Sequence, residues 1–360
     1  MPFDPAKPFD DLPFLPPSAE LETKAVLKKC IAAQRALAEL KGAGDLLPDP
    51  DMLINAIPLL EAKLSSEIEN IVTTHDKLFR AAVGSDDQHD PQTKEVLRYR
   101  TALREGFDAL TRRPLSVNVF HDICSTLRNT PMSVRKRPGT TLSNPETRAV
   151  VYTPPEGEGL LNDLLHNLEV FLHAQDGLDP LVKAAVLHYQ FEAIHPYHDG
   201  NGRTGRILII LYLVERGVLK LPVLYLSRYL IEHRAEYYRL LRQVTESGAW
   251  EPWILYMLTA LEETATQTTQ RIYGIRNLLD TSCAHARKAL PARAYSKELV
   301  ELVFFQPYTK IQFLVENHMA ERKTAAKYLQ MLAEIGILKS VKMGKERVFV
   351  NPKLVSLLRR

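Results

Sequence analysis

The chain has 360 residues, 45% of them hydrophobic, and a formal net charge of +3 at pH 7. This length fits one large globular domain or several smaller ones, and the near balance of charges does not by itself require nucleic acid or an anionic membrane as a partner. Cys30, Cys124 and Cys283 lie far apart in sequence, which excludes a dense disulfide framework or a zinc ribbon. With no apolar run near ~20 residues and no signal core at the N-terminus, we expect a soluble, cytoplasmic protein without a membrane partner.

The first 20 residues are rich in proline and predict an extended arm that lies across the body of the protein. Apolar spacing then predicts helices at residues 20–40 and 55–62. In the next segment, Ser-Ser-Glu-Ile-Glu-Asn-Ile-Val at 65–72, a helix would place Ser65 and Glu69 one turn apart on one face. A carboxylate there can pair with an arginine, although an ordinary helix with a solvated glutamate is the alternative.

Helical spacing returns at 95–110 and 116–127, but residues 135–155 break it. Pro138-Gly139 signals a turn, and residues 148–153 have the pattern of a short strand before Pro154-Pro155. A β-hairpin is therefore predicted within a helical protein. Two further amphipathic helices are expected at 160–172 and 181–194, and the second ends directly before His195.

Residues 195–206 read His-Pro-Tyr-His-Asp-Gly-Asn-Gly-Arg-Thr-Gly-Arg, and the apolar run that follows predicts a buried helix at 203–216. Gly200 and Gly202 permit a tight turn and close approach of a ligand to the backbone. A glycine-rich turn that opens a helix directs free N–H groups at anions. Arg203 and Arg206 lie three residues apart, so both side chains can reach one polyphosphate.

Two more residue types complete the chemistry of this segment. Asp199 supplies a hard oxygen ligand for a phosphate-bound Mg²⁺. His195 precedes the turn, where a general base is needed. The pattern therefore predicts a phosphate cradle with a base at its entrance.

The C-terminal third continues with predicted helices at 224–242, at 250–261 and onward through residue 287, and Pro291 marks a domain boundary. Helices at 296–304, 311–316 and 322–335 then precede two strands at 338–341 and 347–350. This order resembles a winged helix-turn-helix domain, in which Arg322, Lys323 and Lys327 would contact DNA phosphates. The same fold also serves protein contacts and dimerisation.

Segment 195–206 resembles the signature of Fic-domain proteins, His-Pro-Phe-x-Asp/Glu-Gly-Asn-Gly-Arg-x-x-Arg, with Tyr197 in place of Phe. The resemblance implies a mainly α-helical protein, with a Fic-type helical bundle and a β-hairpin flap. We accordingly expect an N-terminal helical region at 1–95, a Fic catalytic core at 96–288 and a winged helix-turn-helix domain at 289–360. It also implies that AMP is transferred from ATP to a protein hydroxyl.

The family's roles carry over to the matching residues. His195 would deprotonate a Ser, Thr or Tyr hydroxyl of the target protein, and Asp199 would hold Mg²⁺ against the α- and β-phosphates of ATP. Arg203 and Arg206 would bind the β- and γ-phosphates, and a tyrosine of the later helix would lie against the base. The predicted nucleotide-binding residues are Glu69, Asp199, Gly200, Asn201, Gly202, Arg203, Thr204, Gly205, Arg206, Tyr237 and Tyr238.

Residues 65–70 resemble the inhibitory motif of Fic proteins, Ser/Thr-x-x-x-Glu-Gly/Asn, through Ser65, Glu69 and Asn70. The resemblance implies an inhibitory helix at about 63–80, in which Glu69 pairs with Arg206 and displaces the γ-phosphate. It also implies that the flap at 135–155 holds the target protein by strand addition.

Two other functions stay open at this point. In one, the protein removes AMP from a modified protein, and Glu69 positions a water molecule. In the other, the chain is a DNA-binding regulator whose Fic core senses a nucleotide. Self-modification and a homodimer are likewise left open by the sequence.

Overall fold

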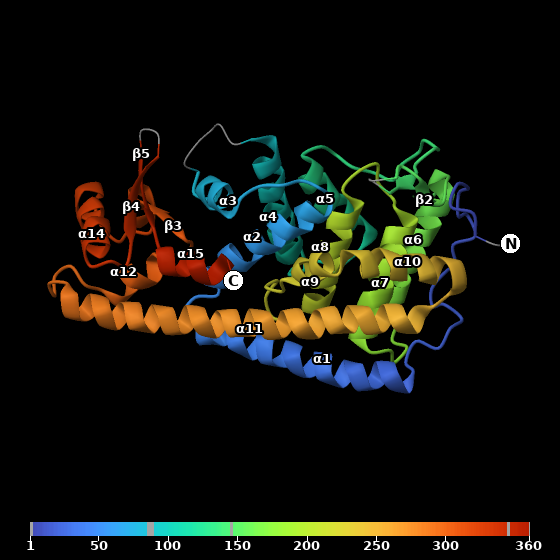
Figure 1. Ribbon diagram of the computed structural model, residues 1–360, viewed down its shortest axis with the longest axis horizontal. Helices are drawn as coiled ribbons and strands as arrows, with labels where there is room; N and C mark the ends of the chain where they lie inside the picture. The colour runs from blue at the N-terminus through green and yellow to red at the C-terminus, as the bar shows by residue number, and fades with distance from the viewer. Residues whose placement is uncertain (1–2, 85–89, 145–146, 344–345, 360) are drawn as a thin grey trace. The chain divides into compact units, whose positions relative to one another are not determined.

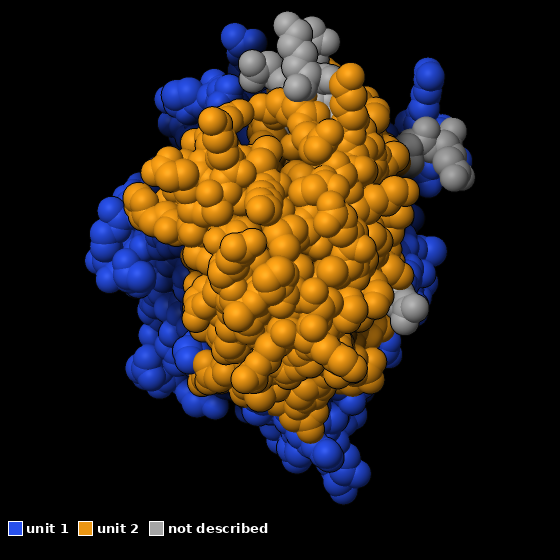
Figure 2. Space-filling view, turned by 90° about the vertical axis from the view of Figure 1, so that its left-hand side faces the viewer, with its two compact units in different colours: residues 1–38, 98–222, 226–264 blue, residues 39–97, 223–225, 265–360 orange. Residues whose placement is uncertain are grey.

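The computed structural model describes residues 3–84, 90–144, 147–343 and 346–359. The chain is mainly helical, as predicted (Figure 1). It divides into two compact units, which Figure 2 distinguishes by colour. Unit 1 comprises residues 1–38, 98–222 and 226–264, and unit 2 comprises residues 39–97, 223–225 and 265–360. Residues 145–146 of the predicted flap and residues 344–345 of the predicted wing lie outside the described residues.

Unit 1 contains most of α1 and α4, the first part of the long helix α11, and the flap strands. Its elements are α1 (Lys24–Ala43), α4 (Pro91–Ala109), α5 (Val117–Arg128), β1 (Leu142–Ser143), β2 (Val150–Tyr152), α6 (Glu158–His173), α7 (Pro180–Ile194), α8 (Asn201–Glu215), α9 (Leu226–Glu232), α10 (Arg234–Ser247) and α11 (Trp250–Ala289).

The centre of unit 1 is the pair of helices α7 and α8. Helix α7 begins at Pro180, and the Asp179 carboxylate caps it by accepting a hydrogen bond from the Leu181 N–H at 2.7 Å. Nearly every residue of both helices is buried, so neither has a polar face. A Cβ at Gly205 would lie 2.6 Å from Glu192 Oε1 and 3.2 Å from Phe191 Cδ1, so this glycine permits the close approach of α8 to α7. The predicted buried helix is confirmed.

The N-terminal arm lies on unit 1 without forming a helix before α1, as predicted, but turns at Asp4–Lys7 and Phe9–Leu12 interrupt the extended conformation that the sequence predicted. The Phe9 N–H donates a hydrogen bond to the Thr153 carbonyl at 3.0 Å, directly after flap strand β2. Further along, Leu15 exchanges two hydrogen bonds with the Asn167 side chain on α6, at 2.7 and 2.9 Å. Leu12 and Leu15 are buried, which attaches the arm to the unit by apolar packing as well.

Unit 2 consists of helices and one small sheet. Its further elements are the short 3-10 helix η1 (Gly44–Leu46), α2 (Asp51–Ile68), α3 (His75–Ala82), α12 (Lys297–Leu302), β3 (Tyr308–Lys310), α13 (Ile311–Glu316), α14 (Arg322–Glu334), β4 (Lys339–Met343), β5 (Glu346–Val350) and α15 (Pro352–Arg359). The sheet is antiparallel in the order β3-β5-β4, with Tyr308 opposite Val350 and Val341 opposite Val348.

The structure corrects several predicted elements. Helix α2 is one helix over Asp51–Ile68 with Pro58 inside it, and Asn70 leaves the helical region with φ 62°, so a continuous helix at about 63–80 is wrong. The helix predicted at 224–242 is interrupted at His233, whose backbone leaves the helical region. Helix α11 runs without a break, whereas β3 and α15 were not predicted. The three residues of β3 are too few to show an alternating pattern, which explains the omission.

A helix that crosses a bilayer needs about 20 predominantly apolar residues. None of the helices within 3–84, 90–144, 147–343 and 346–359 combines the necessary length with sufficient apolar character.

Candidate active site

The predicted phosphate cradle is the connection between α7 and α8 in unit 1. Helix α7 ends at Ile194, and His195 follows in the left-handed region with φ 48°. Gly200 also adopts a left-handed conformation, φ 84°, directly before α8 begins at Asn201. A side chain at Gly200 would be strained by this φ and would contact Arg128 and Cys124 of α5 at 3.3 and 3.5 Å. The turn therefore needs glycine at this position.

Asn201 holds the shape of this turn with its side chain. Its Oδ1 accepts a hydrogen bond from the Tyr197 N–H at 2.9 Å, and its Nδ2 donates to the Tyr197 carbonyl at 2.7 Å. Both ends of the amide are thus used within the loop, so the contribution of Asn201 to anion binding rests on its backbone N–H. The Tyr197 ring is buried, and its hydroxyl lies 2.9 Å from His121 Nδ1 on α5. His121, which appears in the sequence only as a surface position of a helix, therefore supports the loop.

Arg135 is the residue that sequence reasoning missed most clearly. It is almost completely buried at 2% exposure, and its Nε donates to the His195 carbonyl at 2.9 Å. Its Nη2 donates to the Pro155 carbonyl, and its own N–H donates to the Pro196 carbonyl at 2.9 Å. One guanidinium thus joins the end of α7 to the segment after the flap. No local pattern distinguishes this arginine, because its partners are carbonyl groups that any residue can supply.

The flap is attached at the same end of α7. Strands β1 and β2 pair antiparallel, with Leu142 opposite Tyr152 and Ser143 opposite Val150. The Tyr152 hydroxyl donates a hydrogen bond to the Ala193 carbonyl at 2.8 Å, two residues before His195. The predicted hairpin is confirmed for the residues that the structure describes.

His195 is partly exposed, and its environment keeps the imidazole neutral. Burial, followed by the positive charge of Arg135, lowers the pKa of His195 to about 4. At neutral pH the ring is therefore deprotonated and can accept a proton, as a general base must.

The charged residues of the loop differ in exposure. Arg203 and Arg206 are 1% and 2% exposed, whereas Asp199 lies at the surface. The Asp199 carboxylate is 2.9 Å from Arg128 Nη1 and 3.5 Å from Arg203 Nη2. Arg128, at the end of α5, is a second cation that sequence reasoning did not assign to the site.

Four other predicted nucleotide-binding residues lie on α8 and α10: Thr204 and Gly205 on α8, and Tyr237 and Tyr238 on α10. Thr204 and Gly205 are buried, and Gly205 faces α7, so the structure gives them packing contacts. Tyr237 is buried as well, and its hydroxyl lies 2.9 Å from His188 Nε2 in an aromatic cluster with Trp253. Tyr238 is 48% exposed and packs against Arg234, whose guanidinium carbon is 5.7 Å from the ring centroid. Of the two tyrosines, Tyr238 has a ring face available to a ligand.

The three residues of the predicted inhibitory motif lie in unit 2. Ser65 is buried in the last turn of α2, Glu69 caps that helix, and Asn70 adopts a left-handed conformation with φ 62°. Helix α3 then begins after Thr74, whose hydroxyl accepts a hydrogen bond from the Lys77 N–H at 3.2 Å. Glu69 and Arg206 belong to different units.

A mainly helical protein with this loop between two buried helices has the architecture of the Fic fold. The solved structure of a Fic family protein from Desulfovibrio desulfuricans superposes with a TM-score of 0.59 over 94% of this chain and 98% of that one, at 20% identity. Three family models match in order: Fic/DOC family N-terminal at residues 27–108, Fic/DOC family at 115–213, and the C-terminal domain of SoFic-like protein adenylyltransferases at 278–354. The chain belongs to the Fic/DOC family.

Curated relatives are named protein adenylyltransferases. A probable protein adenylyltransferase of Aquifex aeolicus is 28% identical over 195 residues, which are 53% of this chain and 54% of that protein. The protein adenylyltransferase Fic of Culex quinquefasciatus is 34% identical over 112 residues, 31% of this chain and 21% of that protein. The matches thus span about half or less of the length of these relatives.

Proposed function

We propose that this protein is an adenylyltransferase that moves AMP from ATP to a Ser, Thr or Tyr hydroxyl of a target protein. The observation that carries the proposal is the loop at 195–206. A neutral imidazole, His195, follows α7 and is separated by residues 196–200 from the N-terminus of a 15-residue helix whose first two turns carry Arg203 and Arg206. The adenylyltransferase names of the relatives support the same reaction.

In this mechanism His195 accepts the proton of the target hydroxyl. The hydroxyl oxygen then forms a bond to the α-phosphorus of ATP, and the bond from that phosphorus to the oxygen bridging to the β-phosphate breaks. AMP stays on the target and pyrophosphate leaves. The low pKa of His195 keeps the ring in its proton-accepting form, and Arg135 fixes its position through the His195 carbonyl.

The start of α8 is the proposed phosphate-binding site. The first-turn N–H groups of a helix have no carbonyl partner within it, so those that follow Gly200 can bind phosphate oxygens. Arg203 and Arg206 would bind the β- and γ-phosphates, which bring negative charge to two buried guanidinium groups. Tyr238 is the better placed tyrosine for contact with the base because its ring is exposed.

Asp199 is the proposed protein ligand of Mg²⁺. Among the residues within the described ranges, no group of three or more His, Cys, Asp or Glu side chains gathers as a metal site. A single exposed carboxylate suits Mg²⁺ that arrives with ATP, because this ion commonly takes one or two carboxylates together with phosphate oxygens and water. When bound, the ion would neutralise phosphate charge, and Asp199 would exchange its pairing with Arg128 for the metal.

The flap is the proposed binding site for the target segment. Within the described residues its sheet has two strands, and the N-terminal arm bonds to Thr153 directly after β2, so β1 has the edge at which an extended peptide can pair. Its attachment through Tyr152 and Arg135 would hold a hydroxyl added at that edge near His195. The chain itself is one candidate target.

Glu69 is the proposed inhibitor of the reaction, through a pair with Arg206 that would exclude the productive pose of the γ-phosphate. The motif residues Ser65, Glu69 and Asn70 support this proposal, as does the match to the Fic/DOC N-terminal model over 27–108. Removal of AMP is the second candidate function, because the same carboxylate could position a water molecule against an AMP-modified protein.

Labelled ATP tests these proposals directly. The wild type and Glu69→Gly are incubated with a cell lysate, Mg²⁺ and ATP that carries the label at either the α- or the γ-phosphate. We expect protein-bound label from α-labelled ATP only, and more of it with Glu69→Gly. Label from γ-labelled ATP would indicate a kinase reaction instead, and lower activity in Glu69→Gly would favour removal of AMP.

Two matched variants control the experiment. Glu67→Gly alters a neighbouring glutamate on the same helix, which pairs with Lys63 at 2.6 Å, and it should leave transfer at the wild-type level. An equal rise in both glutamate variants would mean that loosening of α2, and not the loss of the Glu69 carboxylate, activates the enzyme. His195→Ala should abolish transfer while ATP binding persists, and residual transfer above a few per cent would exclude His195 as the base.

A further inference from the structure

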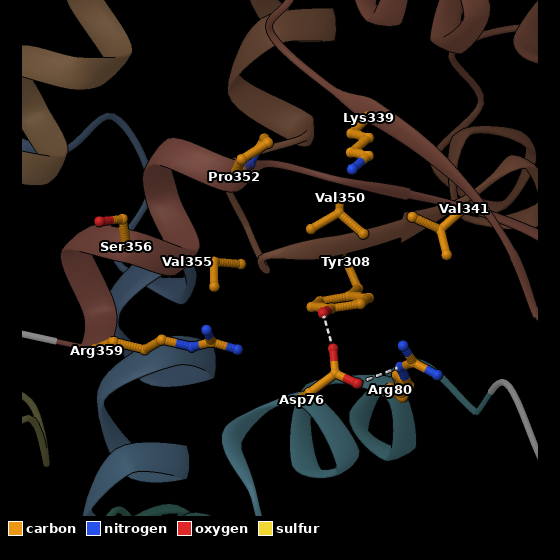
Figure 3. A pocket seen from close by; sticks show the side chains of 10 residues that line it. All are labelled: Asp76, Arg80, Tyr308, Lys339, Val341, Val350, Pro352, Val355, Ser356 and Arg359. Carbon is orange, nitrogen blue, oxygen red and sulfur yellow. Dashed lines mark hydrogen bonds and ion pairs between the residues drawn. The ribbon is translucent and has the colours of Figure 1, made fainter.

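Unit 2 contains a cavity of about 500 Å³ that the proposed reaction does not use (Figure 3). Residues of helix α3, the three-stranded sheet and helix α15 line it. Its lining residues are Asp76, Arg80, Tyr308, Lys339, Val341, Val350, Pro352, Val355, Ser356 and Arg359. Pockets that bind small molecules have volumes of roughly 300–1,000 Å³, so the cavity is large enough for such a ligand.

The single carboxylate in the wall is already engaged. Asp76 accepts a hydrogen bond from the Tyr308 hydroxyl, and its Oδ2 lies 2.8 Å from Arg80 Nε. Burial, together with the nearby Asp76, raises the pKa of Tyr308 to about 12, so the hydroxyl stays protonated and continues to donate. The Asp76 carboxylate therefore bonds to Tyr308 and Arg80, and it forms no ion pair with the other two cations of the lining, Lys339 and Arg359, among the described residues.

Those two cations are Lys339 on β4 and Arg359 on α15. Figure 3 shows them on separate elements, with Lys339 extending toward Val350 and the Arg359 guanidinium toward the side where Tyr308 lies. Among the described residues neither is paired with a carboxylate. Lys310 on β3, on the other side of β5 in the sheet, is different, because it pairs with Glu346 at 2.6 Å and donates to the Gly84 carbonyl at 2.7 Å. The wall of the cavity thus carries more positive than negative charge. The positive charge of Lys310, in contrast, is neutralised by Glu346.

Apolar side chains make up the rest of the lining. Val341, Val350 and Val355 come from β4, β5 and α15, and Val355 is buried. A purely inorganic anion would leave this apolar surface in contact with water, whereas a purely apolar ligand would leave the two cations unmatched. The combination fits a molecule with an anionic group at one end and an apolar or aromatic body.

We propose that this cavity binds a small organic anion, namely a phosphate or carboxylate on an apolar or aromatic body. Lys339 and Arg359 bind the anionic group, and Val341, Val350 and Val355 contact the body. Both cations lie beside apolar side chains in the same pocket, which favours a small ligand with an apolar part over a nucleic acid backbone, which is charged and polar.

Isothermal titration calorimetry on the full chain tests the proposal with phenyl phosphate, inorganic phosphate and phenol. Phenyl phosphate should bind more tightly than either fragment, because it alone satisfies both parts of the cavity. A benzoate titration then tests whether a carboxylate replaces the phosphate. The double variant Lys339→Ala/Arg359→Ala should lower the affinity for phenyl phosphate at least tenfold, whereas Lys353→Ala, an exposed lysine of α15 outside the lining, should not change it.

The loop at 195–206 is a second place where a phosphate could bind, so the titration is repeated with Arg206→Ala. Binding that persists in Arg206→Ala and is lost in the double variant supports the proposal. Binding lost in Arg206→Ala and unchanged in the double variant overturns it, as does the absence of binding at millimolar phenyl phosphate. A short DNA duplex that binds more tightly than phenyl phosphate and depends on Lys339 and Arg359 would assign the two cations to nucleic acid instead.

Discussion

Two helix-to-helix connections in this protein look similar but are built differently. In unit 1 the chain passes from α7 to α8 through residues 195–200, and in unit 2 it passes from α2 to α3 through residues 69–74. Each connection has a non-glycine residue in the left-handed region directly after or near the helix end: His195 with φ 48° and Asn70 with φ 62°.

The difference lies in what fixes the backbone. Side chains fix the first connection, because Asn201, Arg135 and His121 all bond to residues 195–197. Backbone groups bond at the start of the second: the N–H groups of Asn70 and Ile71 donate to the carbonyls of Glu67 and Ser66, both at 3.0 Å. Further along, the Thr73 hydroxyl lies 2.7 Å from Thr93 Oγ1, and Thr74 Oγ1 accepts from the Lys77 N–H at 3.2 Å. Side-chain bonds require particular residue types, whereas backbone bonds leave most residues free to vary. This is why the first connection has a specific sequence signature and the second a weak one.

Replacing Arg135 should cause the largest loss of stability. Arg135→Met removes the donor for the carbonyls of His195 and Pro155 and leaves buried acceptors unpaired, which should cost about 3 kcal/mol in the free energy of unfolding. Because Arg135 also lowers the pKa of His195, the variant should show a higher pKa for that ring, measured by NMR titration.

Lys136→Met is the matched control for this variant. Lys136 is exposed and pairs with Glu158 at 3.0 Å, so its loss should cost less than about 0.5 kcal/mol. If Arg135→Met and Lys136→Met unfold at the same urea concentration, side-chain bonds do not fix the first connection.

Asn201→Ala should have the next largest effect. It removes both hydrogen bonds to the Tyr197 backbone, which we expect to cost about 2 kcal/mol. Asn162→Ala, at an exposed position of α6, should change stability by less than about 0.5 kcal/mol and serves as the control. Urea denaturation measures both, and equal midpoints would contradict the structural role given to the Asn201 amide.

The histidines of α7 and the first connection should make stability depend on acid. Burial lowers the pKa of His188 to about 3 and that of His195 to about 4, both below the value of about 6.5 in an unfolded chain. Between the folded-state pKa values and the unfolded-state value of about 6.5, the unfolded chain binds more protons than the folded protein. The stability that these rings contribute is therefore full above about pH 6.5 and falls as the pH drops toward 4. His188→Phe should flatten this dependence in thermal unfolding curves recorded from pH 7 to pH 4.5, whereas an unchanged slope would exclude His188 as a contributor.

Asn70 should give the smallest effect. Asn70→Ala places an ordinary side chain at a positive φ and should cost about 1 kcal/mol, whereas Asn70→Gly should be neutral or slightly stabilising. Both are measured by urea denaturation. A loss with glycine equal to that with alanine would mean that the Asn70 side chain itself holds the second connection.

The sequence by itself determined the parts of this protein that depend on local spacing. The buried helices on either side of residues 195–200, the non-helical N-terminal arm and the hairpin could all be predicted, because apolar spacing, proline and glycine act over a few residues. The family also followed from the sequence, since nine defined positions within twelve residues describe one particular turn.

Only the tertiary structure decided which distant residues complete the site. Arg135, His121 and Arg128 are ordinary residues of other segments, and their roles arise from carbonyl, hydroxyl and carboxylate partners at least 20 positions away. The cavity with Lys339 and Arg359 likewise exists only because α3, β4 and α15 come together within unit 2. Such contacts bring together segments that are far apart in the chain, and no local pattern in a single sequence encodes them.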